Sequence, residues 1–281
     1  GDLHQNSDKY LKVLWKSLKF LIVYNNCLSL MYVLGPLIAD TILHYGFDYL
    51  QRPLTLPMPL TPLIRYNDTW DVKHYIVTAL NMWAAMEVVV SIEWFIANYA
   101  LLTTFFLTEL IIFKHQVNSL NFDKGDEWEH QVESIVNKHT KIMRLNVELK
   151  DYLGFPGAFI SFFTSMALTF TAFTSFSSSN IPLRLSYGSG FFLYSSSALL
   201  LTSIGQKLEN ESEEVFKAFY SLRWYEFTPN ARKSLNMMMR QARTPLIIDF
   251  HGRYKMNLAN FMQILRSTYS YFTLLREVAS K

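Results

Sequence analysis

The last part of the chain, residues 259–278, reads ANFMQILRSTYSYFTLLREV and predicts a short apolar helix. Side chains three or four residues apart share one face of a helix, and here that face carries hydroxyl, apolar and carboxylate groups: Ser267, Ser270 or Tyr271, Leu274 and Glu277. We interpret this helix as the lining of an ion pore, held or moved by the rest of the chain. The alternative is that Leu274 packs against lipid or a neighbouring helix and that Glu277 is merely solvated.

Enzyme chemistry is poorly supported by the sequence. His115, His130 and His139 lack the spacing of metal ligands, and neither a GxSxG turn nor a glycine-rich phosphate loop is present. We therefore predict that the chain is not an enzyme and needs no metal or other cofactor. The competing class is a membrane transporter or membrane-embedded enzyme, in which Glu87 and Glu93 would be the working acids.

The composition indicates a membrane protein with long water-facing parts. Half of the 281 residues are hydrophobic and 17% are charged, below the roughly 25% of soluble domains. Mean hydropathy is only +0.10, as expected when membrane spans alternate with polar segments. The single cysteine, Cys27, precludes an internal disulfide, and the first residues do not resemble a signal peptide.

The apolar stretches predict an all-α, polytopic membrane bundle. Stretches of about 20 or more apolar residues are long enough to cross a bilayer as helices, and the expected spans are 18–43, 75–113, 152–173, 185–204 and 259–278. The second stretch exceeds one bilayer thickness at about 1.5 Å per residue, so part of it should project into water.

Three longer segments connect these spans. Residues 44–74 form a proline- and aromatic-rich loop with a glycosylation sequon at Asn67. Residues 114–151 predict an amphipathic helix, whose apolar side carries Val132, Ile135, Val136, His139, Ile142, Met143 and Leu149. Residues 206–257 contain a helix that Pro229 initiates, over 230–243, followed by two short extended runs around His251 and Gly252.

The charges orient the chain. Most of the 26 Lys and Arg residues lie before the first span or in the segments 114–150 and 206–257. The positive-inside rule places these parts in the cytoplasm, and the C-terminus and Asn67 outside. This orientation excludes a G-protein-coupled receptor, which ends in the cytoplasm. It also explains the basic residues of 206–257 without a nucleic-acid partner.

The last eighty residues resemble the C-terminal signature of insect odorant receptors. The resemblance rests on Trp224 after an acidic, serine-containing start, on Arg-Thr-Pro at 243–245, and above all on TYSYFTLL at 268–275. Members of that family have seven spans with a cytoplasmic N-terminus, so the five spans here resemble the third to seventh. The co-receptor's long insert within 114–151 is absent and the terminal sequence differs, so the chain resembles a tuning receptor.

The resemblance implies a ligand-gated, non-selective cation channel in the plasma membrane of olfactory sensory neurons. A tuning receptor assembles with co-receptor subunits as a heterotetramer, and the last helix of each subunit lines the pore. Aligned on the pair Tyr271 and Phe272, Leu274 falls at the hydrophobic gate and Glu277 at the outer mouth. A hydrophobic ring blocks ions by dewetting, and a carboxylate attracts cations.

The resemblance also implies a pocket for a small volatile hydrophobic ligand in the outer half of the membrane bundle. Candidate lining residues share helical faces there, although each could instead be ordinary packing: Tyr32, Gly35, Ala39, Met82, Trp83, Met86, Phe163, Met166, Phe170, Tyr187, Phe191 and Tyr194. Phe191 and Tyr194 are the preferred pair, three residues apart beside small serines.

The resemblance further implies that the cytoplasmic parts of the last four spans form an anchor domain with most of the subunit contacts. Its candidates are the helix 229–243 and the residues Phe216, Phe219, Tyr220 and Trp224. Trp224 is equally compatible with a core position. The expected organisation is the start, two spans and their loop (1–113), the next helix and two spans (114–205), the anchor (206–258) and the pore helix (259–281).

Overall fold

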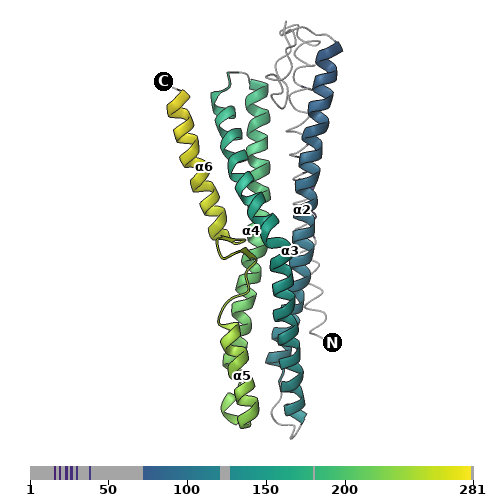
Figure 1. Ribbon diagram of the computed structural model, residues 1–281, viewed down its shortest axis with the longest axis vertical. Helices are drawn as coiled ribbons and strands as arrows, with labels where there is room; N and C mark the ends of the chain where they lie inside the picture. Colours follow the sequence, from purple (N-terminus) through teal and green to yellow (C-terminus); the bar gives the residue numbers. More distant parts are fainter. Residues whose placement is uncertain are drawn as a thin grey trace. The chain divides into compact units, whose positions relative to one another are not determined.

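The computed structural model describes residues 72–120, 127–179 and 181–279, together with the single helical positions 16, 19, 23, 24, 26, 27, 30 and 38. The elements follow one another as α2 (Val72–Asn118), α3 (Glu127–Ser177), α4 (Ile181–Ser221), η1 (Trp224–Glu226), α5 (Pro229–Ala242), β1 (Asp249–Phe250), β2 (Tyr254–Lys255) and α6 (Leu258–Ala279) (Figure 1). Apart from one two-stranded hairpin, the described residues form helices and turns, which confirms the predicted all-α class. Asn67 and most of the first predicted span lie outside these residues.

The local signals of the sequence account for the shorter elements. Thr228 caps α5 by accepting a hydrogen bond from the backbone of Ala231 at 3.5 Å, and Pro229 occupies the first turn. The two extended runs form an antiparallel hairpin in which Phe250 pairs with Tyr254. Its turn places Gly252 at φ +72°, where glycine is favoured because it has no Cβ.

The long helices extend further than the predicted spans. Residues 127–151 and the predicted span 152–173 both belong to α3, one helix of 51 residues with Pro156 inside it. Two helices are long and apolar enough to cross a membrane among the residues described, namely the Met86–Asn118 part of α2 and the His130–Ser177 part of α3. α4 and α6 have a lower mean hydropathy than these two helices, because serine, glycine and other polar residues interrupt their apolar stretches.

The chain divides into two compact units. Among the described residues, unit 1 contains Asn98–Ser161 and Leu199–Met262, and unit 2 contains the segment up to Ala97, Phe162–Ala198 and Gln263 onward. The helices α2, α3, α4 and α6 each contribute residues to both units.

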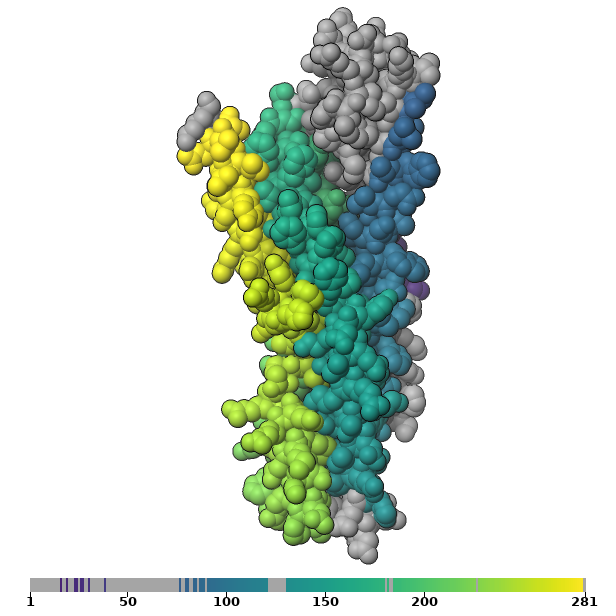
Figure 2. All heavy atoms as spheres, viewed as in Figure 1, coloured from purple at the N-terminus to yellow at the C-terminus, as the bar shows by residue number. Residues whose placement is uncertain are grey.

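The core of unit 1 is built from apolar residues at helical spacing. α2 contributes Tyr99, Phe106, Leu110, Phe113 and Val117, α3 contributes Val132, Ile135, His139, Ile142 and Leu153, and α4 contributes Leu201, Leu208, Val215 and Phe219. The buried positions on α3 confirm four members of the stripe predicted for 114–151. Residues of α5 lie beside the first half of α3 in Figure 2, and Ala242 at the end of α5 lines a small internal cavity together with His139 and Ile142.

His139 is a packed core residue. Its ring lies 5.9 Å from that of Phe113 and 5.6 Å from that of Phe219, with the latter pair in an edge-on arrangement. Phe113 and Phe219 also meet edge to face at 5.8 Å. Such aromatic geometry contributes about 0.5–1.5 kcal/mol per pair beyond the buried area.

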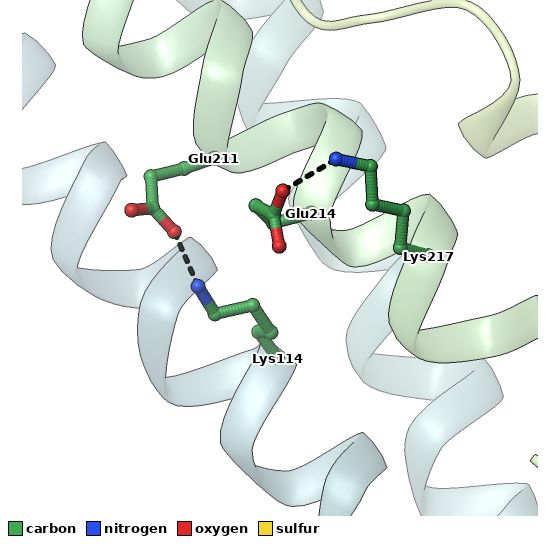
Figure 3. A network of polar contacts seen from close by, with 4 residues as sticks. All are labelled: Lys114, Glu211, Glu214 and Lys217. Carbon is green, nitrogen blue, oxygen red and sulfur yellow. Dashed lines mark hydrogen bonds and ion pairs between the residues drawn. The ribbon is translucent and has the colours of Figure 1, made fainter. Parts of the chain in front are cut away.

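Of the ion pairs at the surface of unit 1, one lies between two helices and another within a single helix. Lys114 on α2 and Glu211 on α4 approach to 2.6 Å, whereas Glu214 and Lys217 pair at 2.7 Å within α4 (Figure 3). The hydrogen bond and positive charge of Lys217 lower the pKa of the Glu214 carboxyl. The pair within α4 is exposed, so it adds little to stability. The Lys114–Glu211 pair is partly buried and fixes α2 against α4.

Unit 2 carries large apolar side chains on its surface, including Trp83, Trp94, Phe162, Phe176 and Phe192. Many of its hydroxyl groups are bonded within their own helices, as in the Thr169 bond to the carbonyl of Ser165 at 2.8 Å, and Ser175 of α3 donates to the carbonyl of Arg184 of α4 at 3.0 Å. An apolar surface whose hydroxyl groups bond to the protein's own backbone suits a lipid environment.

Candidate functional site

The predicted pore face lies on the second half of α6. Ser267 is half-buried, whereas Ser270, Tyr271, Leu274 and Glu277 are exposed in the single chain. The hydroxyl of Ser270 donates to the carbonyl of Arg266 at 3.0 Å, so its hydrogen is used within the helix. An exposed face of mixed polarity on an apolar helix is available to line a water-filled path.

An aromatic contact holds this half of α6. Phe272 packs edge to face against Phe176 at the end of α3, with ring centroids 5.5 Å apart. Phe272 is half-buried and the pore candidates on either side of it are exposed. The packed Phe272 and the exposed Tyr271 and Leu274 therefore lie on different parts of the helix surface.

The start of α6 is fixed by polar contacts. Asn257 caps the helix by accepting a hydrogen bond from the backbone of Asn260 at 3.2 Å, and its amide donates to Glu209 on α4 at 3.1 Å. The side chain of Gln206 accepts a bond from the backbone of Leu258 at 3.3 Å. These groups satisfy donors that every helix N-terminus leaves open. They were missed in the sequence, although asparagine directly before an apolar helix is a known start signal.

Two glycines allow the segment before α6 to approach α3 and α4. A methyl group on Gly205 of α4 would lie 1.7 Å from the carbonyl oxygen of Met256, and one on Gly157 of α3 would lie 2.2 Å from the Met256 methyl. Met256 is buried and its sulfur lies 3.9 Å from the hydroxyl of Ser161. Any larger residue at Gly205 would force the backbone of this segment away.

The hairpin before α6 is joined to α3 as well. Lys150 forms an ion pair with Asp249, and Phe155 packs edge to face on Phe250 at 5.5 Å. The backbone of Leu246 donates to the Ser212 hydroxyl of α4 at 2.8 Å. The segment between α5 and α6 is thus bound at several points.

The structure brings together part of the predicted ligand-binding set. Phe170 of α3 and Tyr187 of α4 meet edge to face at 6.2 Å, with Tyr187 buried. Of the other described candidates, three are half-buried, namely Phe191, Tyr194 and Met86. Three are exposed, namely Trp83, Phe163 and Met166. Tyr32, Gly35, Ala39 and the side chain of Met82 lie outside the described residues.

Tyr194→Ala is expected to raise the odorant concentration for half-maximal response about ten-fold, because a half-buried aromatic face would be lost from the pocket. Dose–response curves of odorant-evoked current provide the measurement. Phe192→Ala, which removes an exposed ring two residues away, is the control. An unchanged curve for Tyr194→Ala would place the pocket elsewhere.

The anchor candidates differ in their surroundings. Phe219 is 0% exposed and belongs to the core of unit 1, so its predicted role as a subunit contact is wrong. Its burial follows from its place on the apolar side of α4, four residues after Val215. Tyr220 is 69% and Trp224 47% exposed, and Phe216 is half-buried, so these three remain interface predictions.

The two acids of the transporter interpretation do not form a pair. Glu87 accepts a hydrogen bond from the indole of Trp83 at 3.0 Å and is exposed, whereas Glu93 is half-buried. Six residues of α-helix place them about 120° apart around α2. Within the described residues, no cluster of three or more His, Cys, Asp or Glu side chains is positioned to hold a metal ion.

The fold and these contacts define a helical membrane protein. The start of its last helix, α6, and the segment before it are held by contacts with α3 and α4. A family model described as 7tm Odorant receptor matches residues 2–269. The chain therefore belongs to the seven-transmembrane odorant receptor family and is a membrane protein of that family.

Individual relatives agree with this membership. Odorant receptor 49a of Drosophila melanogaster is 27% identical over 148 residues, which are 53% of this chain and 37% of that protein. An odorant receptor coreceptor of Ooceraea biroi is 26% identical over 141 residues, or 50% of this chain and 30% of that protein. The matched segments thus span well under two thirds of these relatives. Both are receptors by name, in agreement with the prediction that the chain is not an enzyme.

A solved structure shares the fold. The insect olfactory receptor OR5 from Machilis hrabei, solved in complex with eugenol, superimposes with a TM-score of 0.73 at 18% sequence identity. The superposition covers 99% of this chain and 70% of that receptor. The predicted arrangement as a membrane bundle of odorant receptor type is confirmed at the level of the fold.

Proposed function

We propose that the chain is an odorant receptor subunit of a ligand-gated, non-selective cation channel in the plasma membrane of olfactory sensory neurons. The carrying observation is family membership together with an α6 that exposes Ser270, Tyr271, Leu274 and Glu277 along its outer half. In this proposal Leu274 forms the hydrophobic gate and Glu277 concentrates cations at the outer mouth.

A volatile hydrophobic ligand binds among the aromatic residues of α3 and α4. The packed pair Phe170 and Tyr187 supports an aromatic wall, and the half-buried Phe191 and Tyr194 follow on the same side of α4. Aromatic rings with few polar groups suit a small apolar molecule. The eugenol of the Machilis receptor is a compound of this type.

The subunit acts as a tuning receptor within a heterotetramer that also contains co-receptor subunits. Exposed Tyr220 and Trp224 beside the basic helix α5 support a subunit contact there, because aromatic and arginine side chains are enriched in interfaces. A sequon at Asn67 would be glycosylated on the outer side.

Electrophysiology of the receptor expressed with and without an odorant co-receptor tests this proposal. Odorant-evoked cation current only in the presence of the co-receptor is the expected result. Current without the co-receptor would instead indicate a homomeric channel. If the receptor is present at the cell surface, absence of current both with and without the co-receptor would contradict the channel proposal.

Glu277→Gln is expected to lower calcium permeability relative to sodium by about two- to three-fold, because one carboxylate per subunit is lost from the mouth. Reversal potentials under exchanged external cations measure this ratio. Glu213→Gln, a change of the same charge on an exposed residue of α4, is the control. Equal permeability in the parent and Glu277→Gln would remove the proposed role.

A further inference from the structure

The contacts between α4 and the start of α6 form a polar clamp, defined by Gln206, Glu209 and Asn257. One carboxylate oxygen of Glu209 accepts bonds from the amides of Asn257 at 3.1 Å and of Gln206 at 3.3 Å. The oxygen of Gln206 accepts from the backbone of Leu258. A buried residue, Asn257, is therefore joined to α4 by a charge-assisted hydrogen bond.

A second set of contacts joins the same turn to α3. The amide of Asn260 donates to the hydroxyl of Ser161 at 3.5 Å, and Met256 fills the space that Gly157 and Gly205 leave open. The first turn of α6 is thus held by α3 and α4 together. Its position depends on theirs.

α4 runs without interruption from the ligand candidates to the clamp. Tyr187, Phe191 and Tyr194 precede Gln206 on this one helix of 41 residues. Rigid secondary elements are among the structures that carry coupling between distant sites, so α4 provides a route from the ligand candidates to the clamp. The clamp is the set of side chains through which that shift would reach the helix with the pore face.

We infer that Gln206, Glu209 and Asn257 are positioning residues for gating, which transmit movement of α4 to α6. This inference rests on the proposed channel function. Opening the clamp would leave the ligand site and the pore face unaltered and would weaken the coupling between them. Ligand would then be needed at higher concentration for the same current.

Asn257→Asp breaks the clamp selectively. Aspartate has the same shape and is an equally good N-cap, so the acceptor for the Asn260 backbone is kept. It replaces the amide donor by a carboxylate that faces Glu209, and the two charges repel. The half-maximal odorant concentration is expected to rise about ten-fold, the change that corresponds to loss of a hydrogen bond to a charged group.

Glu209→Gln in the Asn257→Asp background restores the bond between positions 209 and 257 with donor and acceptor exchanged, while the Gln206 amide keeps its bond to Asn210. This double variant is expected to return the half-maximal concentration to within about two-fold of the parent, which a general loss of stability would not do. Glu213→Gln serves as the control for a charge change on α4. Surface protein and calcium selectivity are measured for every variant, and both should match the parent.

The outcomes separate the two levels of the proposal. If the parent gives odorant current and Asn257→Asp leaves the half-maximal odorant concentration unchanged, the coupling role alone is overturned. An increase in the half-maximal concentration that the double variant fails to reverse would also overturn it. A lower concentration requirement in Asn257→Asp would also overturn it. Absence of odorant current in the parent would overturn the channel function, and the coupling role with it.

Hydrogen exchange of residues 258–266 provides a measure independent of current. Faster exchange in Asn257→Asp, restored in the double variant, is expected if the clamp holds the first turns of α6. Equal exchange in all variants would overturn the clamp itself.

Discussion

Phe219→Ala is expected to lower the free energy of unfolding by about 3–5 kcal/mol, the largest change we predict for this chain. Its side chain is fully buried in unit 1 and packs against the rings of Phe113 and His139. Truncation removes buried apolar area and leaves a cavity among rigid rings that cannot close around it. The cost is a large part of the roughly 5–15 kcal/mol that stabilises a typical protein domain.

An exposed aromatic residue of the same unit provides a control. Tyr152→Ala also removes an aromatic ring, but this ring is mostly exposed, so a change within about 0.5 kcal/mol is expected. Thermal unfolding of the purified receptor in detergent, with surface expression in cells, measures both variants. Equal destabilisation by the two substitutions would contradict the assignment of Phe219 to the core.

Leu274→Ser is expected to raise the current without odorant by about ten-fold or more, because a hydroxyl at the gate allows water and ions to fill the constriction. Leu274 is 59% exposed in the single chain and follows Tyr271 by three residues on the proposed pore face. The rise should persist in cells that express normal amounts of surface receptor. Resting conductance measured before any ligand is applied is the readout.

Leu275→Ser tests whether the effect depends on the face. Its side chain points about 100° away from that of Leu274 around the helix, so a small change in resting current is expected. Comparable leak from both variants would indicate general loosening of α6. No leak from Leu274→Ser at normal surface levels would remove Leu274 from the gate.

Much of the fold follows from local signals in the sequence. The apolar stripe of 114–151 predicted the buried positions Val132, Ile135, His139 and Ile142, because a helix with that spacing has one side to bury. Pro229 predicted α5 to within a residue at each end. The glycine at 252 marked the hairpin turn, because it tolerates positive φ.

Helical spacing distinguishes the buried Phe219 from the exposed Tyr220, but it does not identify the residues that cover Phe219. Phe219 and Tyr220 are adjacent and both were predicted at a subunit interface, yet one is buried and the other exposed. Phe219 continues the series Leu208, Ser212 and Val215 at intervals of four, three and four residues, a signal that indicates the buried side of α4. The identity of the rings that cover it could not be predicted, since helical periodicity defines a face and not its partner.

The terminal helix shows what local sequence determines and what tertiary packing determines. By itself the sequence determined that residues 259–278 form an apolar helix, which residues share its mixed face, and to which family the chain belongs. Only the tertiary structure decided how that helix begins. Asn257 meets Glu209, 48 residues earlier in the chain, and Gly205 admits the backbone of Met256. Contacts between distant residues depend on how helices pack, and local propensity carries no information about that packing.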